Sequence, residues 1–80
     1  MDVATFNNIV RKIPVTYAVF LLRKRPTWLG DEHQTKYLYY YAGSFAYLKN
    51  GAPVLLGIKP SAVDFVGYYT MDQYKLLAGG

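Results

Sequence analysis

Apolar positions along this chain form four runs that proline and glycine residues separate. The first run lies at the N-terminus. Its apolar side chains recur at i, i+3, i+4 and i+7, the spacing of one face of a helix. These residues are Phe6, Ile9, Val10 and Ile13. Asp2 is a suitable N-cap for this segment. The spacing predicts a basic amphipathic helix over residues 2–12.

The second apolar run covers residues 13–22 and lies between two clusters of cations. A bilayer-spanning helix needs about 20 apolar residues, so this run is about half the required length. Its β-branched residues allow a strand. The cations at residues 23–25 suit the C-terminus of a helix, and Pro26 ends the element. We therefore predict a second helix over residues 15–25.

The third run, residues 36–58, is apolar and rich in tyrosine, and no charge lies between Lys36 and Lys49. Asp31 is a good N-cap and Gly51 is a good helix terminator, so the pattern predicts a helix over residues 31–50. Such a helix would be about 30 Å long. Three small residues would let a second helix approach it closely: Ala42, Gly43 and Ala46.

The same segment also fits a β-hairpin. Asn50 and Gly51 form a strong type I′ turn signal, and residues 52–58 could be the returning strand. Pro53 would then stand near the start of an edge strand. This alternative predicts a small α+β fold with a hairpin at 50–51.

The last run predicts a helix over residues 61–78, which Ser61 and Asp64 would start as a variant capping box. Gly67 is the weak point of this helix. The first choice of fold is therefore mainly α, with three to four short helices in an extended arrangement. The chain would be a single unit, residues 1–80, with a basic N-terminal segment over residues 1–25.

Composition indicates that this unit needs partners. Only 18% of its 80 residues are charged, whereas 52% are hydrophobic. A chain of this length buries only about 60% of its unfolded surface, so apolar surface is left over. It has no cysteine for a disulfide or a thiolate metal site. We expect no metal and no cofactor.

The net charge of +4 is concentrated in the N-terminal third of the chain. Its cations would contact anionic lipid headgroups or partner subunits: Arg11, Lys12, Arg23, Lys24 and Arg25. Interfacial aromatic residues would join them: Trp28, Tyr37, Tyr40 and Tyr41. His33 follows two carboxylates, but adjacent residues on a helix do not face one another, so we expect a solvated or structural histidine.

These features predict a non-catalytic accessory subunit of a large membrane-bound assembly. A basic, acid-poor amphipathic start is typical of mitochondrial import signals, here uncleaved. The expected location is the mitochondrial inner membrane, in ATP synthase or the respiratory chain. The partners would be other subunits and anionic lipid, and nucleic acid is not expected.

Two other classes of function fit the composition. Tyrosine is enriched at protein interfaces, so the chain could be a small soluble interaction module or a structural protein of a virion or filament. Its basic charge also fits an RNA- or ribosome-associated protein, although such a protein usually carries more lysine and arginine.

Overall fold

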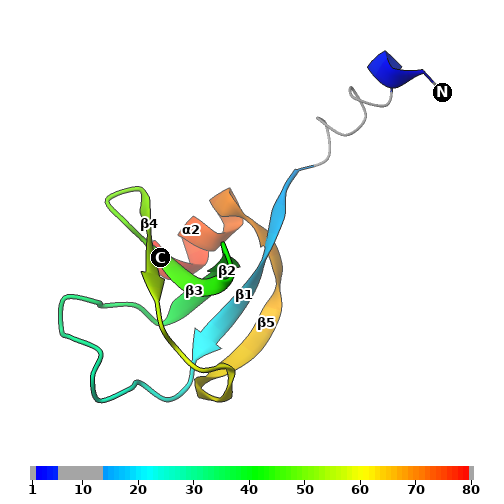
Figure 1. Ribbon diagram of the computed structural model, residues 1–80. Helices are drawn as coiled ribbons and strands as arrows, with labels where there is room; N and C mark the ends of the chain where they lie inside the picture. The colour runs from blue at the N-terminus through cyan, green and yellow to red at the C-terminus, as the bar shows by residue number, and fades with distance from the viewer. Residues whose placement is uncertain (1, 6–13, 80) are drawn as a thin grey trace.

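The fold is built on a five-stranded antiparallel β-sheet with one C-terminal helix (Figure 1). The structure is a computed structural model that describes residues 2–5 and 14–79. Its elements follow in this order: β1 (Thr16–Leu22), β2 (Tyr37–Tyr41), β3 (Ser44–Lys49), β4 (Ala52–Leu56), the 3-10 turn η1 (Pro60–Ala62), β5 (Val63–Thr70) and α2 (Met71–Gly79). The strand order is β4-β3-β2-β1-β5, and each neighbouring pair is antiparallel.

Both faces of this sheet are covered, and each carries its own apolar cluster. On the helix face, α2 contacts β5, β1 and β2. The buried cluster on this face consists of Val19, Tyr39, Ala46 and Tyr74. The loop face is covered by the segment between β1 and β2 and by the segment after β4. The buried cluster on this face consists of Leu29, Leu38, Phe45, Tyr47, Leu56, Ile58 and Val63. Each fully buried large apolar side chain contributes about 1.5–3 kcal/mol, so the two clusters together stabilise a small domain.

Helix α2 begins with a reciprocal cap and is anchored by one tyrosine. The Gln73 amide donates to Thr70 Oγ1 over 3.2 Å, and the Thr70 amide donates to Gln73 Oε1 over 2.9 Å. This is a capping box, which satisfies two amides that the helix itself leaves unpaired. The Tyr74 side chain is fully buried, and its hydroxyl donates to the Tyr37 carbonyl over 2.7 Å. Burial raises the pKa of Tyr74 to about 12.

The prediction of a mainly α fold is wrong, and the alternative of a small α+β fold is closer. Residues 15–25, predicted as a helix, contain β1 instead. This strand hydrogen-bonds to β2 on one side and β5 on the other. Its β-branched and aromatic side chains suit a strand that packs on both faces, and this packing outweighs the favourable cations at its C-terminus.

The helix predicted over residues 31–50 is also wrong. Residues 31–36 lie in a loop, and two hairpins follow. The first turns at Ala42 and Gly43, with φ of 51° and 79°, and the second turns at Asn50 and Gly51, with φ of 53° and 77°. Positive φ at both central residues is the mark of a type I′ turn, so the hairpin signal at 50–51 is confirmed.

The C-terminal helix is only partly confirmed. Ser61 lies in η1 and not in a helix N-cap, and residues 63–70 form β5. The helix starts at Met71, after the Thr70 cap. The strand is favoured at residues 63–70 because its side chains pair with β1, and because Gly67 weakens a helix there.

The N-terminal prediction falls mostly outside the described residues. Residues 3–5 are helical, and the Thr5 amide donates to Asp2 Oδ1 over 2.7 Å, as the N-cap prediction requires. That bond holds the pKa of Asp2 below its usual value. The rest of the segment, with Arg11 and Lys12, is not described. No helix within residues 2–5 and 14–79 is both long enough and apolar enough to cross a bilayer.

We expect Gly51→Ala to lower the free energy of unfolding by about 1–2 kcal/mol, because an L side chain resists the left-handed backbone at this position. The control is Gly57→Ala, which adds its methyl group to open space and has no positive φ. That change should raise stability by about 0.4–1 kcal/mol. Urea denaturation of the two variants checks this, and equal effects would contradict the type I′ assignment.

Candidate functional site

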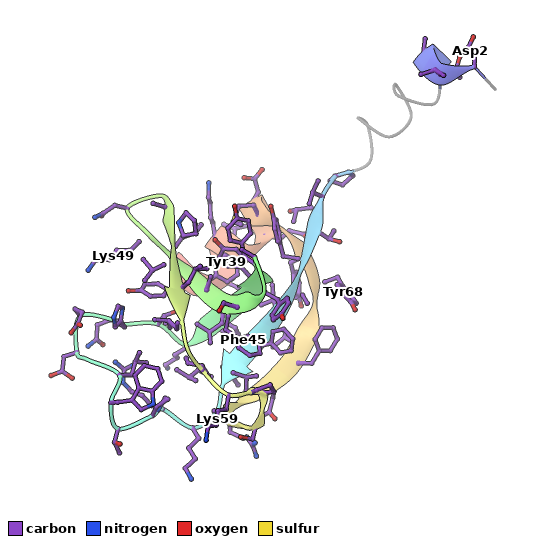
Figure 2. All side chains as sticks on the ribbon, in the orientation of Figure 1. Asp2, Tyr39, Phe45, Lys49, Lys59 and Tyr68 are labelled. Carbon is purple, nitrogen blue, oxygen red and sulfur yellow. The ribbon has the colours of Figure 1, made fainter. Side chains whose placement is uncertain are left out.

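A row of five aromatic rings crosses the loop face of the sheet, and we call it the aromatic row: Tyr40, Phe45, Phe20, Phe65 and Tyr68. Successive ring centroids are 5.0–5.5 Å apart, in edge-to-face geometry. Phe45 is buried, whereas Tyr68 is 71% exposed. The row is therefore anchored in the core and reaches solvent on β5, where Figure 2 labels Tyr68 at the side of the sheet.

Strand β5 carries most of this exposed apolar surface and lies at one edge of the sheet. A β-bulge between the Val19 and Phe20 pairings leaves Val66 without a partner residue in β1. Phe65 pairs with Phe20, and Tyr68 pairs with Ala18, so the bulge keeps both aromatic side chains on the loop face. Within the described chain, the other edge of β5 pairs with no strand.

The two edges of the sheet differ in how they resist further pairing. Strand β4, at the opposite edge, contains Pro53, which has no backbone amide to donate. Strand β5 contains no proline and no lysine. Its one charge, Asp64, lies 3.4 Å from Arg23 Nε. Natural edge strands usually carry proline, lysine or a β-bulge, and of these β5 has only the bulge at Val66. Apart from that bulge, the edge of β5 is open to a partner strand.

A second feature is a cavity of about 340 Å³ beside η1, which we call the Trp28 pocket. Residues 24–28 form one wall, and the chain around η1 forms the other. Its lining includes three cations and, among the described residues, no carboxylate: Lys24, Arg25 and Lys59. Figure 2 labels Lys59 near this end of the sheet, and the Trp28 side chain is 61% exposed.

Hydrogen bonds fix the backbone around this pocket. The amides of Arg23 and Lys24 both donate to the Ala62 carbonyl, over 3.0 and 3.1 Å. The Arg25 guanidinium donates to the Gly30 carbonyl over 2.8 Å. Leu29 is buried in the loop-face cluster, next to Trp28 in the sequence. The pocket is thus held against the sheet at both ends.

His33 has a structural contact that the sequence alone did not show. Its Nδ1 lies 2.7 Å from the Tyr47 hydroxyl, and its Nε2 lies 3.5 Å from a Glu32 carboxylate oxygen. Glu32 and His33 touch because they lie in a loop and not on a helix. Tyr47 is buried, so the pair fixes residues 31–36 to the sheet.

The structure brings together only some of the residues predicted to contact lipid or partners. Lys24, Arg25 and Trp28 line one pocket, and Arg23 is next to it, paired with Asp64. The three predicted tyrosines lie on different faces of the sheet. Tyr40 belongs to the aromatic row on the loop face. On the helix face, Tyr37 packs against the cluster and Tyr41 lies near Tyr39: their rings are 6.0 Å apart.

The small residues predicted for helix packing do not share a helix. Ala42 and Gly43 are the two central residues of the first hairpin turn, and Ala46 is a fully buried residue of β3. Ala46 lies in the same cluster as Tyr74 of α2, so its small side chain leaves room for that helix.

Sequence reasoning missed Lys59 and the β5 end of the aromatic row. Residues 63–70 do contain a signal, since valine, phenylalanine and tyrosine are enriched in strands and Gly67 disfavours a helix. The pairing of Phe65 with Phe20 depends on a long-range register that no local pattern gives.

Comparison with known protein families, with curated proteins and with solved structures finds no match to this chain. The class of protein that the fold defines is a small antiparallel β-sheet domain with a C-terminal helix.

Proposed function

We propose that this chain is a non-catalytic subunit of a larger assembly, and that an extended strand of a neighbouring subunit pairs with the free edge of β5. The observation that carries the proposal is the exposed apolar strand itself: Phe65, Val66 and Tyr68 are 54%, 40% and 71% exposed. Strand addition would satisfy the backbone groups of that edge, and side-chain contacts would give specificity.

The chemistry of the edge favours an uncharged, extended partner segment. The only charge in β5 is already paired with Arg23, so a partner strand would meet no unpaired charge along it. The aromatic row continues beneath the edge, so apolar side chains of the partner would extend a surface that is already packed. Aromatic side chains of this kind often dominate the binding energy of interfaces.

Of the function expected from the sequence, this proposal keeps the non-catalytic subunit that acts through protein–protein contacts. The mitochondrial inner membrane, the ATP synthase or respiratory-chain assignment and the contacts with anionic lipid stay predictions. The helix predicted over residues 31–50 is absent, and the exposed edge of β5 is now the observation that supports the proposal most directly.

The test is fractionation of the full chain in its native cells, by membrane pelleting, carbonate extraction and a native gel in mild detergent. We expect the wild-type chain to migrate with a large species. A Val66→Lys/Tyr68→Lys variant should migrate as a small species, because charges on an edge strand oppose strand addition. The matched control is Leu76→Lys on α2, at a side chain that is 76% exposed.

Two results would contradict the proposal. One is a wild-type chain that migrates only as a small species. The other is a purified wild-type chain that forms a dimer which the β5 variant abolishes, since the occupant of the edge would then be a second copy.

A further inference from the structure

The Trp28 pocket combines the two chemistries that single-stranded nucleic acids require of a protein. Phosphates bind lysine and arginine, and bases stack on aromatic side chains. Here three cations line one cavity with the only tryptophan of the chain. An indole that is 61% exposed leaves a flat apolar surface uncovered beside these charges.

Among residues 2–5 and 14–79, no ion pair engages the three cations of the pocket. Asp64 is the acidic residue closest in sequence to η1, and it is engaged by Arg23 outside the pocket lining. Arg25 uses one guanidinium nitrogen for the Gly30 carbonyl, and a guanidinium has five N–H donors in total. Lys24 and Lys59 belong to opposite walls of the pocket.

The pocket also lies close to the exposed end of the aromatic row. Ala62 lines the pocket, and Phe65 follows it three residues later along the start of β5. At about 3.3 Å per residue this separation is roughly 10 Å.

We propose that the Trp28 pocket binds a nucleotide of a single-stranded nucleic acid, with the base stacked on Trp28 and the phosphate held by Lys24, Arg25 and Lys59. This differs from the expectation that nucleic acid is not a partner. No residue of β5 lines the pocket, so the pocket adds a ligand to the proposed subunit.

The test uses the fluorescence of Trp28, which reports this site alone because the chain has no other tryptophan. Titration of the full chain with oligothymidylate at low salt should quench this fluorescence to saturation. Contacts with up to three phosphates should give a slope of log affinity against log salt of about −2, at about −0.7 per phosphate.

Variants separate a built site from a diffuse positive charge. Measured by anisotropy of a labelled oligothymidylate, Trp28→Ala should weaken binding roughly five- to 150-fold, since stacking on one aromatic residue is worth about 1–3 kcal/mol. Lys24→Ala and Lys59→Ala should each weaken it several-fold. The control is Lys49→Ala/Lys75→Ala, at cations that line a different cavity between β3 and α2, and it should bind like the wild type.

Several outcomes would overturn the proposal. One is the absence of quenching by oligothymidylate, including the case in which vesicles of phosphatidylcholine and phosphatidylserine quench instead, which would identify a lipid site. Another is full quenching by inorganic phosphate alone, which would exclude base stacking. Equal weakening by the Lys49→Ala/Lys75→Ala control would show that general charge, and not the pocket, binds the strand.

Discussion

Replacing Tyr74 with alanine is expected to lower the free energy of unfolding by about 3–5 kcal/mol, the usual loss for truncating a buried aromatic side chain. Tyr74 is fully buried and is the only residue of α2 in that class. Its ring packs 4.9 Å from the Tyr39 ring, and its hydroxyl donates to the Tyr37 carbonyl. Because a domain of this size is stable by only about 4–12 kcal/mol, the variant should lose at least about a quarter of its total stability.

Two controls separate the parts of this effect in urea denaturation followed by circular dichroism. Tyr74→Phe removes only the hydroxyl and should lose about 1 kcal/mol, the typical worth of a hydrogen bond. Leu76→Ala changes an exposed residue of the same helix and should stay within about 0.5 kcal/mol of the wild type. If Tyr74→Ala behaved like Leu76→Ala, α2 would not be packed on the sheet.

Alkaline pH is expected to destabilise the fold through the same residue. Burial raises the pKa of Tyr74 to about 12, whereas an unfolded tyrosine titrates near 10. The unfolded chain therefore loses this proton first as pH rises, so stability is full below about pH 10 and falls between about 10 and 12. Two pKa units correspond to a loss of up to about 3 kcal/mol. Burial and the neighbouring Tyr17 and Tyr41 also raise the pKa of Tyr39, which acts in the same direction.

Urea midpoints measured between about pH 8 and pH 12 check this, with Tyr74→Phe as the matched variant. Phenylalanine does not titrate, so the variant should lose less stability than the wild type over this interval. Equal losses in the two proteins would show that Tyr74 does not cause the alkaline transition.

The tyrosine-rich segment shows why the sequence predicted a helix where the structure has strands. Leu38 and Tyr39 are adjacent in β2 and are both buried, one on each face of the sheet. A strand that is covered on both faces has no polar alternation, so its pattern is a continuous apolar run. That run resembles a buried helix, and its length then favoured the helix over the hairpin.

The turn signal at 50–51 was more reliable than the cap signals and the apolar runs. Asn50 and Gly51 form the turn that the sequence predicted, because a type I′ turn depends mainly on its two central residues. The start of α2 was placed too early because Ser61 and Asp64 resembled the capping box that Thr70 and Gln73 form.

The candidate site was predictable only where its residues are close in sequence. Lys24, Arg25 and Trp28 stand together along the chain, and they line one pocket. Lys59 joins them only because η1 returns to the end of β1, where the Ala62 carbonyl accepts two amides. Pairing across the sheet likewise creates the aromatic row, so no single segment reveals it.

The most direct test of the central claim, that a partner strand pairs with the free edge of β5, is hydrogen–deuterium exchange of the amides in residues 63–70. It compares the purified full chain with the same chain in its native complex. Strand addition predicts slower exchange over residues 63–70 in the complex, because amides that face the free edge become hydrogen-bonded, and little change in β4, where Pro53 protects the other edge. Unchanged exchange in β5 within an intact complex would contradict the claim.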